Sequence, residues 1–233
     1  MISNISIRNF KSLKDLTLSI GNLSIFTGLN GSGKSTLLQS LLLLRQSFNT
    51  SIKKYQGLII QDGDIVSLGK GKDVLYQYAK DEKTEMEITD DENTFLWSFS
   101  YAFDATILSI AEERSNKLNE CNLFTTNFQY LNTEHLSPQT LHSKNDTQIT
   151  KYDNIGTKGE FSIHYLAKYG LDKKINDKKL KHSKAKSNSL IHQVDAWMSE
   201  ISPGTKLAIK EIKDIDYVKL AIQFEDMQGY SNE

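Results

Sequence analysis

The chain has 233 residues, a formal net charge of −1 and a single cysteine, Cys121. This length suits one large domain or two small ones. No apolar run approaches the roughly 18–20 residues of a membrane-spanning helix, and the sequence starts with a strand pattern, so we expect neither a membrane anchor nor a signal peptide. A lone cysteine cannot form an internal disulfide, which favours a reducing cytoplasm. The near-zero net charge neither favours nor excludes nucleic acid as a partner.

The first elements expected along the chain are two half-buried strands, because apolar and polar residues alternate over 2–8 and 16–20. Residues 22–27 are apolar and β-branched enough to predict a third strand. The leucine-rich run 36–45 contains no helix breaker and predicts a helix. A strand, the glycine-rich stretch 28–35 and then a helix is the order that a phosphate-binding loop requires.

That stretch, Gly28-Leu-Asn-Gly-Ser-Gly-Lys-Ser35, has the pattern Gly-x4-Gly-Lys-Ser/Thr of a P-loop, which predicts binding of a nucleoside triphosphate. Glycines let backbone N–H groups approach a phosphate, and the start of the following helix favours negative charge. Lys34 would reach the β- and γ-phosphates, the Ser35 hydroxyl would ligate Mg²⁺, and Thr36 could donate to the α-phosphate. A Gly/Ser-rich turn that only caps a helix is the alternative, which the flanking strand and helix disfavour. The predicted nucleotide-binding residues of the loop are Gly28, Asn30, Gly31, Ser32, Gly33, Lys34, Ser35 and Thr36.

Beyond the P-loop helix, the pattern predicts both helices and strands. Residues 58–68 are expected to form a hairpin that turns at Asp62 and Gly63. Helices are expected over 73–79, 159–169 and 189–201, and strands over 84–88, 94–103, 128–131, 206–212 and 217–224.

The predicted fold class is therefore α/β, a P-loop NTPase with more antiparallel pairing than a plain doubly wound sheet. We expect residues 1–131 to form an ATP-binding core lobe with the P-loop and antiparallel strands. Residues 132–233 are expected to form a helical or insert region with a closing strand pair, at the start of a second lobe.

Two parts of the chain resemble a known family. The stretches 5–13 (Ile-Ser-Ile-Arg-Asn-Phe-Lys-Ser-Leu) and 26–36 are similar to the opening of ABC-type ATPases of the SMC, RecF and OLD kind. The stretches 130–138 and 155–161 are similar to bacterial AAA-family ATPases of the OLD/RecF-like kind that act in anti-phage defence. This sequence departs from them at His135, where the relatives often carry Arg.

The resemblance implies an ABC/SMC-like ATPase head with an antiparallel β subdomain, which binds ATP and Mg²⁺. It adds Lys11 to the nucleotide-binding residues and implies a homodimer formed through the ATPase heads. It also implies DNA as a possible partner, and a possible effector protein such as a nuclease.

Hydrolysis in this family needs a hydrophobic strand that ends in Asp-Glu, whose Glu activates the attacking water. Asp62 lies too close to the P-loop and precedes a turn, and Glu225-Asp226 ends a strand that alternates as if half exposed. A Ser-Gly-Gly-type signature is also missing. The catalytic residue is therefore unknown, and we expect the chain to be the N-terminal part of a longer ATPase that ends before its catalytic strand. A natural short paralogue is the alternative.

Three charged or titratable groups need separate interpretation. Residues 168–186 hold eight lysines and two aspartates, a composition typical either of contact with a phosphate backbone or of a flexible surface loop. Residues 81–92 carry seven acidic side chains, which favours a charged hairpin tip over a metal site. The histidines are not spaced as metal ligands, so no zinc is expected. They are His135, His142, His164, His182 and His192.

Two classes of function remain open from the sequence. In the first, the chain is the head of an ATP-driven DNA-processing or phage-defence machine, an enzyme completed by dimerisation and downstream sequence. In the second, it is a nucleotide-gated binding module with little or no hydrolysis. A transport ATPase subunit is a poorer fit, since the segment 132–135 contains no Gln.

Overall fold

The computed structural model describes residues 1–48, 52, 57–91, 93–114, 118–134, 136–137, 139–212 and 215–224. The chain divides into two compact units, Met1–Phe128 and Gln129–Glu233, which we call unit 1 and unit 2 and describe separately. This division is close to the predicted border at residue 131. The assignment of the two regions to functional lobes stays a prediction.

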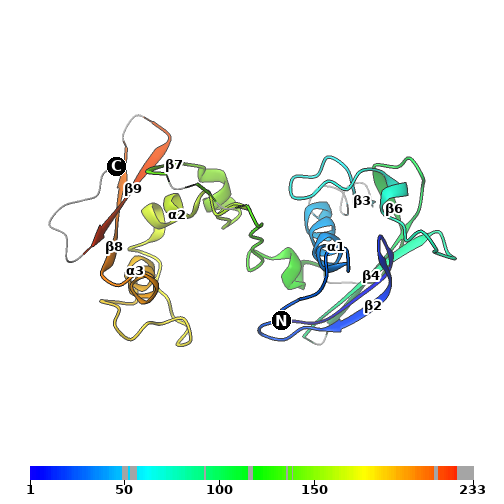
Figure 1. The fold of residues 1–233 in the computed structure, drawn as a ribbon, viewed down its shortest axis with the longest axis horizontal. Helices are drawn as coiled ribbons and strands as arrows, with labels where there is room; N and C mark the ends of the chain where they lie inside the picture. The colour runs from blue at the N-terminus through cyan, green and yellow to red at the C-terminus, as the bar shows by residue number, and fades with distance from the viewer. Residues whose placement is uncertain are drawn as a thin grey trace. The chain divides into compact units, whose positions relative to one another are not determined.

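Unit 1 is built on a six-stranded antiparallel sheet in the order β2-β1-β4-β5-β6-β3. The helix α1 (Lys34–Ser47) packs against this sheet (Figure 1). Three short 3-10 helices lie at Gly71–Asp73, Leu118–Glu120 and Asn122–Phe124. The strands are β1 (Ile2–Phe10), β2 (Leu13–Ser19), β3 (Gly57–Ile59), β4 (Lys83–Asp90), β5 (Asn93–Ser100) and β6 (Ile107–Arg114).

The core of unit 1 follows from the alternation in its strands. Every second residue of β4 is buried, and the large aromatic side chains of β5 point to the same side. Leucines of α1 close the core from above the sheet. The largest fully buried side chains include Trp97, Phe10, Phe95, Phe99, Ile7, Leu43 and Leu44. The predicted strand pair 84–88 and 94–103 is confirmed as β4 and β5, although β5 ends at Ser100.

Residues 22–27 form no strand, although their composition predicts one. All of residues 21–30 are exposed, with Leu23 at 81% and Ile25 at 75%. A strand needs a neighbour for its backbone hydrogen bonds, and none of the described strands pairs with this segment. Within the part of the chain that the structure describes, this prediction is wrong.

The predicted hairpin over 58–68 is also wrong. The strand β3 pairs with β6, and the chain returns through a loop closed by one hydrogen bond from the Leu68 N–H to the Ile60 carbonyl, 2.8 Å. The Gln46 amide of α1 bonds to two carbonyls and two N–H groups of this segment. This side chain therefore takes the place that a second hairpin strand would occupy.

Three further differences concern short segments. Residues 73–79 contain no helix beyond the end of the 3-10 turn Gly71–Asp73, and residues 128–131 are irregular. The strand β6 was not predicted, because its outer half is charged and exposed. Its place in the sheet depends on pairing with β5 and β3 and not on its own pattern.

Unit 2 contains a three-stranded antiparallel sheet in the order β7-β9-β8. Two helices, α2 (Ser162–Tyr169) and α3 (Leu190–Ile201), pack against it (Figure 1). A short π-helical turn covers Thr147–Lys151. The strands are β7 (Leu141–Ser143), β8 (Thr205–Glu211) and β9 (Tyr217–Phe224). The two helices and the closing strand pair are confirmed, whereas β7 was not predicted.

Candidate functional site: the P-loop and its surroundings

The P-loop, residues 28–35, follows the exposed residues 21–27 and runs into the first turn of α1, which begins at Lys34. Three glycines of the loop have positive φ: Gly28 at 150°, Gly31 at 82° and Gly33 at 95°. The Leu37 N–H donates to the Gly33 carbonyl at 3.1 Å, as the first intrahelical hydrogen bond. The N–H groups of residues 34–36, in the first turn of α1, have no intrahelical carbonyl as a partner and can donate to an anion.

Two of these glycines are also required by close packing. A Cβ on Gly33 would lie 3.0 Å from the Leu13 side chain and 3.2 Å from the Ser12 hydroxyl. A Cβ on Gly28 would lie 3.1 Å from the Ser32 hydroxyl. The loop is therefore pressed between its own side chains and the turn that joins β1 to β2.

Lys34 folds back over the loop that precedes it. Its Nζ donates to the carbonyls of Gly28 and Leu29, each at 2.7 Å. These bonds place a cation at the mouth of the loop, where a phosphate would lie. Ser35 is exposed, and Thr36 is 8% exposed with its hydroxyl 3.3 Å from that of Ser12. These positions suit the predicted roles of Lys34 and Ser35, which stay predictions.

Asn30, Gly31 and Ser32 complete the loop on its exposed side. All three are exposed, and nothing would meet a Cβ on Gly31 within 4 Å. The Ser32 N–H donates to the Leu29 carbonyl at 3.3 Å. The structure thus brings all eight predicted loop residues into one short turn, and the side of it that carries Gly31 is open.

A groove of about 310 Å³ adjoins the loop. It is lined by leucines of β2, by Ile25 and Phe26, and by Ser32, Gly33 and Lys34 of the loop. An apolar floor beside a phosphate-binding turn suits a ligand that has both a flat apolar part and a charged part. Among the residues that the structure describes, no acidic side chain lines this groove.

Lys11 also lies next to α1. It belongs to the β1–β2 turn, and its Nζ donates to the Gln39 Oε1 at 3.1 Å. Sequence reasoning did not find Gln39. The signal that could have found it is its place on α1, five residues after Lys34.

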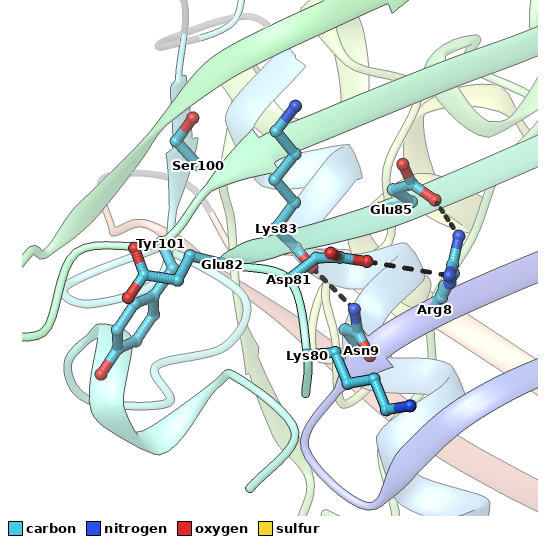
Figure 2. Close-up of a pocket in the computed structure, with 9 residues that line it drawn as sticks. All are labelled: Arg8, Asn9, Lys80, Asp81, Glu82, Lys83, Glu85, Ser100 and Tyr101. Carbon is cyan, nitrogen blue, oxygen red and sulfur yellow. Dashed lines mark hydrogen bonds and ion pairs between the residues drawn. The ribbon is translucent and has the colours of Figure 1, made fainter. Parts of the chain in front are cut away.

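A larger hollow of about 640 Å³ lies at the other side of the β1–β2 turn (Figure 2). Arg8 is shared there between Asp81, at 3.8 Å, and Glu85, at 3.5 Å. The hollow carries three cationic and three anionic side chains, so it offers no net charge to a phosphate. The nucleotide site is better assigned to the smaller groove, where the loop geometry lies.

The lysine-rich segment 168–186 starts in the last turn of α2 and continues into the loop of unit 2 that leads to α3. It is held by the buried Gln193, whose amide bonds to the His182 N–H and the Ser187 carbonyl, both at 2.7 Å. The Trp197 indole N–H donates to the Leu180 carbonyl at 3.0 Å. These hydrogen bonds give the loop a defined path, and its interpretations as a phosphate-backbone contact and as a solvated surface loop both stay predictions.

The eight lysines of this loop fall into three groups, one of which is Lys174 alone, whose Nζ donates to the Leu171 carbonyl at 2.8 Å. Lys168, Lys173 and Lys184 pair with Asp146, Asp153 and Glu200. Within the described residues, four others have side chains without an ionic or hydrogen-bonding partner: Lys178, Lys179, Lys181 and Lys186.

Asp90, Cys121 and His164 are buried and have structural contacts. Asp90 accepts hydrogen bonds from Asn122, and burial raises the pKa of the Cys121 thiol to about 11. His164 accepts the Asn145 N–H at Nδ1, and burial lowers its pKa. Asp62 lies in the loop after β3, whereas His135 and Glu225-Asp226 lie outside the described residues.

The sequence model of the AAA ATPase domain family matches residues 1–227. The chain belongs to the AAA ATPase domain family. This membership agrees with the P-loop geometry and with an α/β fold that contains an antiparallel sheet. Membership of this family suggests that the chain binds ATP, usually with Mg²⁺, and hydrolyses it. A comparison with curated proteins finds no match. Among the described residues, no helix of this AAA ATPase domain is long and apolar enough to cross a membrane.

Proposed function

We propose that the chain is the ATP-binding region of an SMC/RecF/OLD-like ATPase that serves a DNA-processing or phage-defence machine in the cytoplasm. The observation that supports the proposal most is the Lys34 ammonium, which lies on the Gly28 and Leu29 carbonyls at the mouth of a glycine turn. On ATP binding, Lys34 exchanges these carbonyls for the β- and γ-phosphates.

The other loop residues divide the remaining work. The backbone N–H groups from Asn30 to Ser35 surround the phosphates, and the exposed Ser35 hydroxyl ligates Mg²⁺. Thr36 faces the α-phosphate, and Lys11 adds a second cation from the β1–β2 turn. The apolar groove beside the loop receives the base and ribose.

The test is calorimetric titration of the chain with Mg-ATP. Lys34→Ala should weaken binding by about 1.5–3 kcal/mol, since a charge-assisted phosphate contact is lost. Lys14→Ala, an exposed lysine of β2, is the matched control and should leave the affinity unchanged. Ser35→Ala should weaken Mg-ATP more than metal-free ATP. An ATP affinity that Lys34→Ala does not change would contradict the proposal.

The two functional classes differ in whether the complete protein hydrolyses ATP. The groove at the P-loop has no acidic lining residue, and a carboxylate is needed to orient the attacking water. We therefore expect this chain to turn over ATP very slowly even when saturated. This result alone suits both an ATPase completed from elsewhere and a nucleotide-gated binding module. Fast turnover that Lys34→Ala abolishes would show that a catalytic carboxylate lies within the chain.

The proposed partners follow from the same reading. A homodimer through the ATPase heads and an effector protein such as a nuclease are implied by the resemblance. DNA is supported by the four unpartnered lysines of the 168–186 loop. Because the loop is anchored by Gln193 and Trp197, it presents these cations without a large further loss of chain entropy.

A further inference from the structure

The β1–β2 turn has an unusual backbone. Asn9 and Lys11 both have positive φ, at 55° and 50°. Residues other than glycine rarely adopt this conformation, and it persists only where the surroundings determine it. The two residues flank Phe10, which is fully buried.

Asn9 is fixed to β4 and to the segment before it. Its side chain is 7% exposed, and its Nδ2 donates to the Lys83 carbonyl at 3.2 Å (Figure 2). Its own carbonyl accepts the Tyr76 N–H at 3.2 Å and the Thr84 hydroxyl at 3.0 Å. Asparagine tolerates positive φ better than most residues do, and here its amide also locks the turn to the sheet.

The far side of the turn is fixed as well. The Lys11 N–H donates to the Val74 carbonyl at 2.6 Å. A bridge joins Phe10 to Leu75. The turn is therefore held by residues 74–76 and by the start of β4, independently of its contacts with α1.

This turn presents three consecutive residues to the P-loop helix. Lys11 bonds to Gln39, the Ser12 hydroxyl lies 3.3 Å from that of Thr36, and the Leu13 side chain would lie 3.0 Å from a Cβ on Gly33. The contacts run from the last glycine of the loop to the second turn of α1. A shift of the turn would move Lys11 relative to the phosphate site.

The partner of Lys11 is an uncharged amide, so its positive charge is not neutralised. Arg8, three residues earlier on the other side of the turn, shows the opposite arrangement, with Asp81 and Glu85 at its guanidinium (Figure 2). A hydrogen bond to an amide holds an ammonium in place but costs less to break than a bond to a carboxylate. Lys11 is thus held near the loop and stays available to an anion.

We propose that Asn9 and Gln39 are positioning residues for Lys11: Asn9 sets the turn that carries it, and Gln39 holds its ammonium beside the P-loop until a nucleotide phosphate takes it. The inference rests on the proposed function, since it needs ATP to bind at the loop. Asn9 and Gln39 act only through Lys11 and contact no part of the nucleotide.

The test is a double-mutant cycle on the full chain, titrated with Mg-ATP. Asn9→Gly keeps the backbone free to adopt positive φ but removes the amide. Lys11→Met removes the ammonium. Each single variant should weaken binding about tenfold. Asn4→Gly, the same change elsewhere on β1, should leave the affinity within about twofold of the original. The double variant of Asn9 and Lys11 should bind no more weakly than the worse single one, because both changes remove one contact.

A second cycle uses a residue on the surface of α1. Gln39→Glu should trap Lys11 in an ion pair and weaken Mg-ATP binding about tenfold, and this effect should disappear when Lys11 is Met. Leu38→Glu places the same charge one residue away on an exposed position and should have little effect. Additive effects in either cycle, or equal effects of Asn9→Gly and Asn4→Gly, would overturn the inference. If the unmutated chain does not bind Mg-ATP, the proposed function itself fails.

Discussion

In unit 1, apolar side chains of the sheet and of α1 enclose one continuous core that includes Trp97, Phe95 and Phe99. In unit 2, by contrast, Ile149 and Val218 are the only apolar side chains that are buried within the described residues. The other buried side chains of unit 2 are polar, and they include His164 and Gln193. The comparison teaches that one chain uses two sources of stability: burial of apolar area in unit 1 and hydrogen bonds of buried polar side chains such as His164 and Gln193 in unit 2.

The strongest way to break this comparison is to cut into the core of unit 1. Phe99→Ala should destabilise unit 1 by about 3–5 kcal/mol through lost burial and a cavity. Phe103→Ala, at a position 59% exposed, is the matched control and should change little. Each unit contains one tryptophan, Trp97 or Trp197, so denaturant unfolding of each can be followed by fluorescence after the other is changed to Phe. A fall in the stability of unit 2 as well would show that the units are coupled.

The core of unit 1 is also where the sequence was most informative. The strands β1, β4 and β5 follow from alternation, because one face of each is buried in the core of unit 1. Residues 22–27 have strand composition and no strand partner, and strand pairing is a property of two segments that a pattern in one cannot predict. The Gln46 amide bonds to the loop where the second strand of a hairpin was predicted. Because Gln46 lies on α1, a turn signal within residues 58–68 cannot indicate this contact.

The candidate site likewise has a part that the sequence predicts and a part that it does not. The eight P-loop residues are found from the motif, because the backbone of a glycine turn depends on local sequence. The contacts of Lys11 with Gln39 and of Ser12 with Thr36 arise from packing of the β1–β2 turn on α1, which no spacing in the sequence indicates. The partition of the lysines in 168–186 likewise depends on which carboxylates the fold brings near.

The second prediction sharpens the comparison in function: unit 1 takes the nucleotide and unit 2 takes a polyanion. The slope of log affinity for duplex DNA against log salt concentration should become less steep by about three to four units when four phosphate contacts are lost. Filter binding over a salt series measures this slope. The changed residues are Lys178, Lys179, Lys181 and Lys186, each replaced by Gln.

The control removes the same charge from unit 1. Four exposed lysines from the described part of unit 1, replaced by Gln together, should leave the slope unchanged, and neither set should alter ATP affinity. Equal slopes for both sets would mean that the 168–186 loop is only a solvated surface. The control residues are Lys14, Lys72, Lys80 and Lys83.

The third prediction tests whether polar groups really hold unit 2. Gln193 is 4% exposed and bonds to His182 and Ser187, at the C-terminal end of the lysine-rich loop. Gln193→Leu leaves the partly buried His182 N–H and Ser187 carbonyl without their side-chain partner, which should cost about 1–3 kcal/mol. Gln148→Leu in the same unit removes a partly exposed amide and should cost little. If both variants unfold at the denaturant concentration of the unmutated chain, apolar contacts and not this amide stabilise unit 2.

The smallest effect expected is a dependence of stability on pH that only unit 2 shows. All five histidines of the chain lie beyond residue 128, so unit 1 contains none. His164 is 3% exposed and His142 is 7% exposed, and burial lowers the pKa of both below the usual value of 6.5. Protonation of His164 would also break the bond that its Nδ1 accepts from the Asn145 N–H at 3.0 Å.

The sign follows from which state binds more protons. Above pH 6.5 both histidines are neutral in the folded and the unfolded chain, and unit 2 has its full stability. As the pH falls below 6.5, the unfolded chain takes up protons that the folded chain refuses, so the stability of unit 2 falls until the lowered folded pKa is reached. Thermal unfolding between pH 8 and pH 5.5, followed at Trp197, should therefore show a decline that Trp97 does not report. His164→Gln keeps an acceptor for Asn145 and should remove part of the decline, leaving the contribution of His142. A decline of equal size at Trp97 would contradict the assignment, because no side chain of unit 1 has its ordinary pKa in that range.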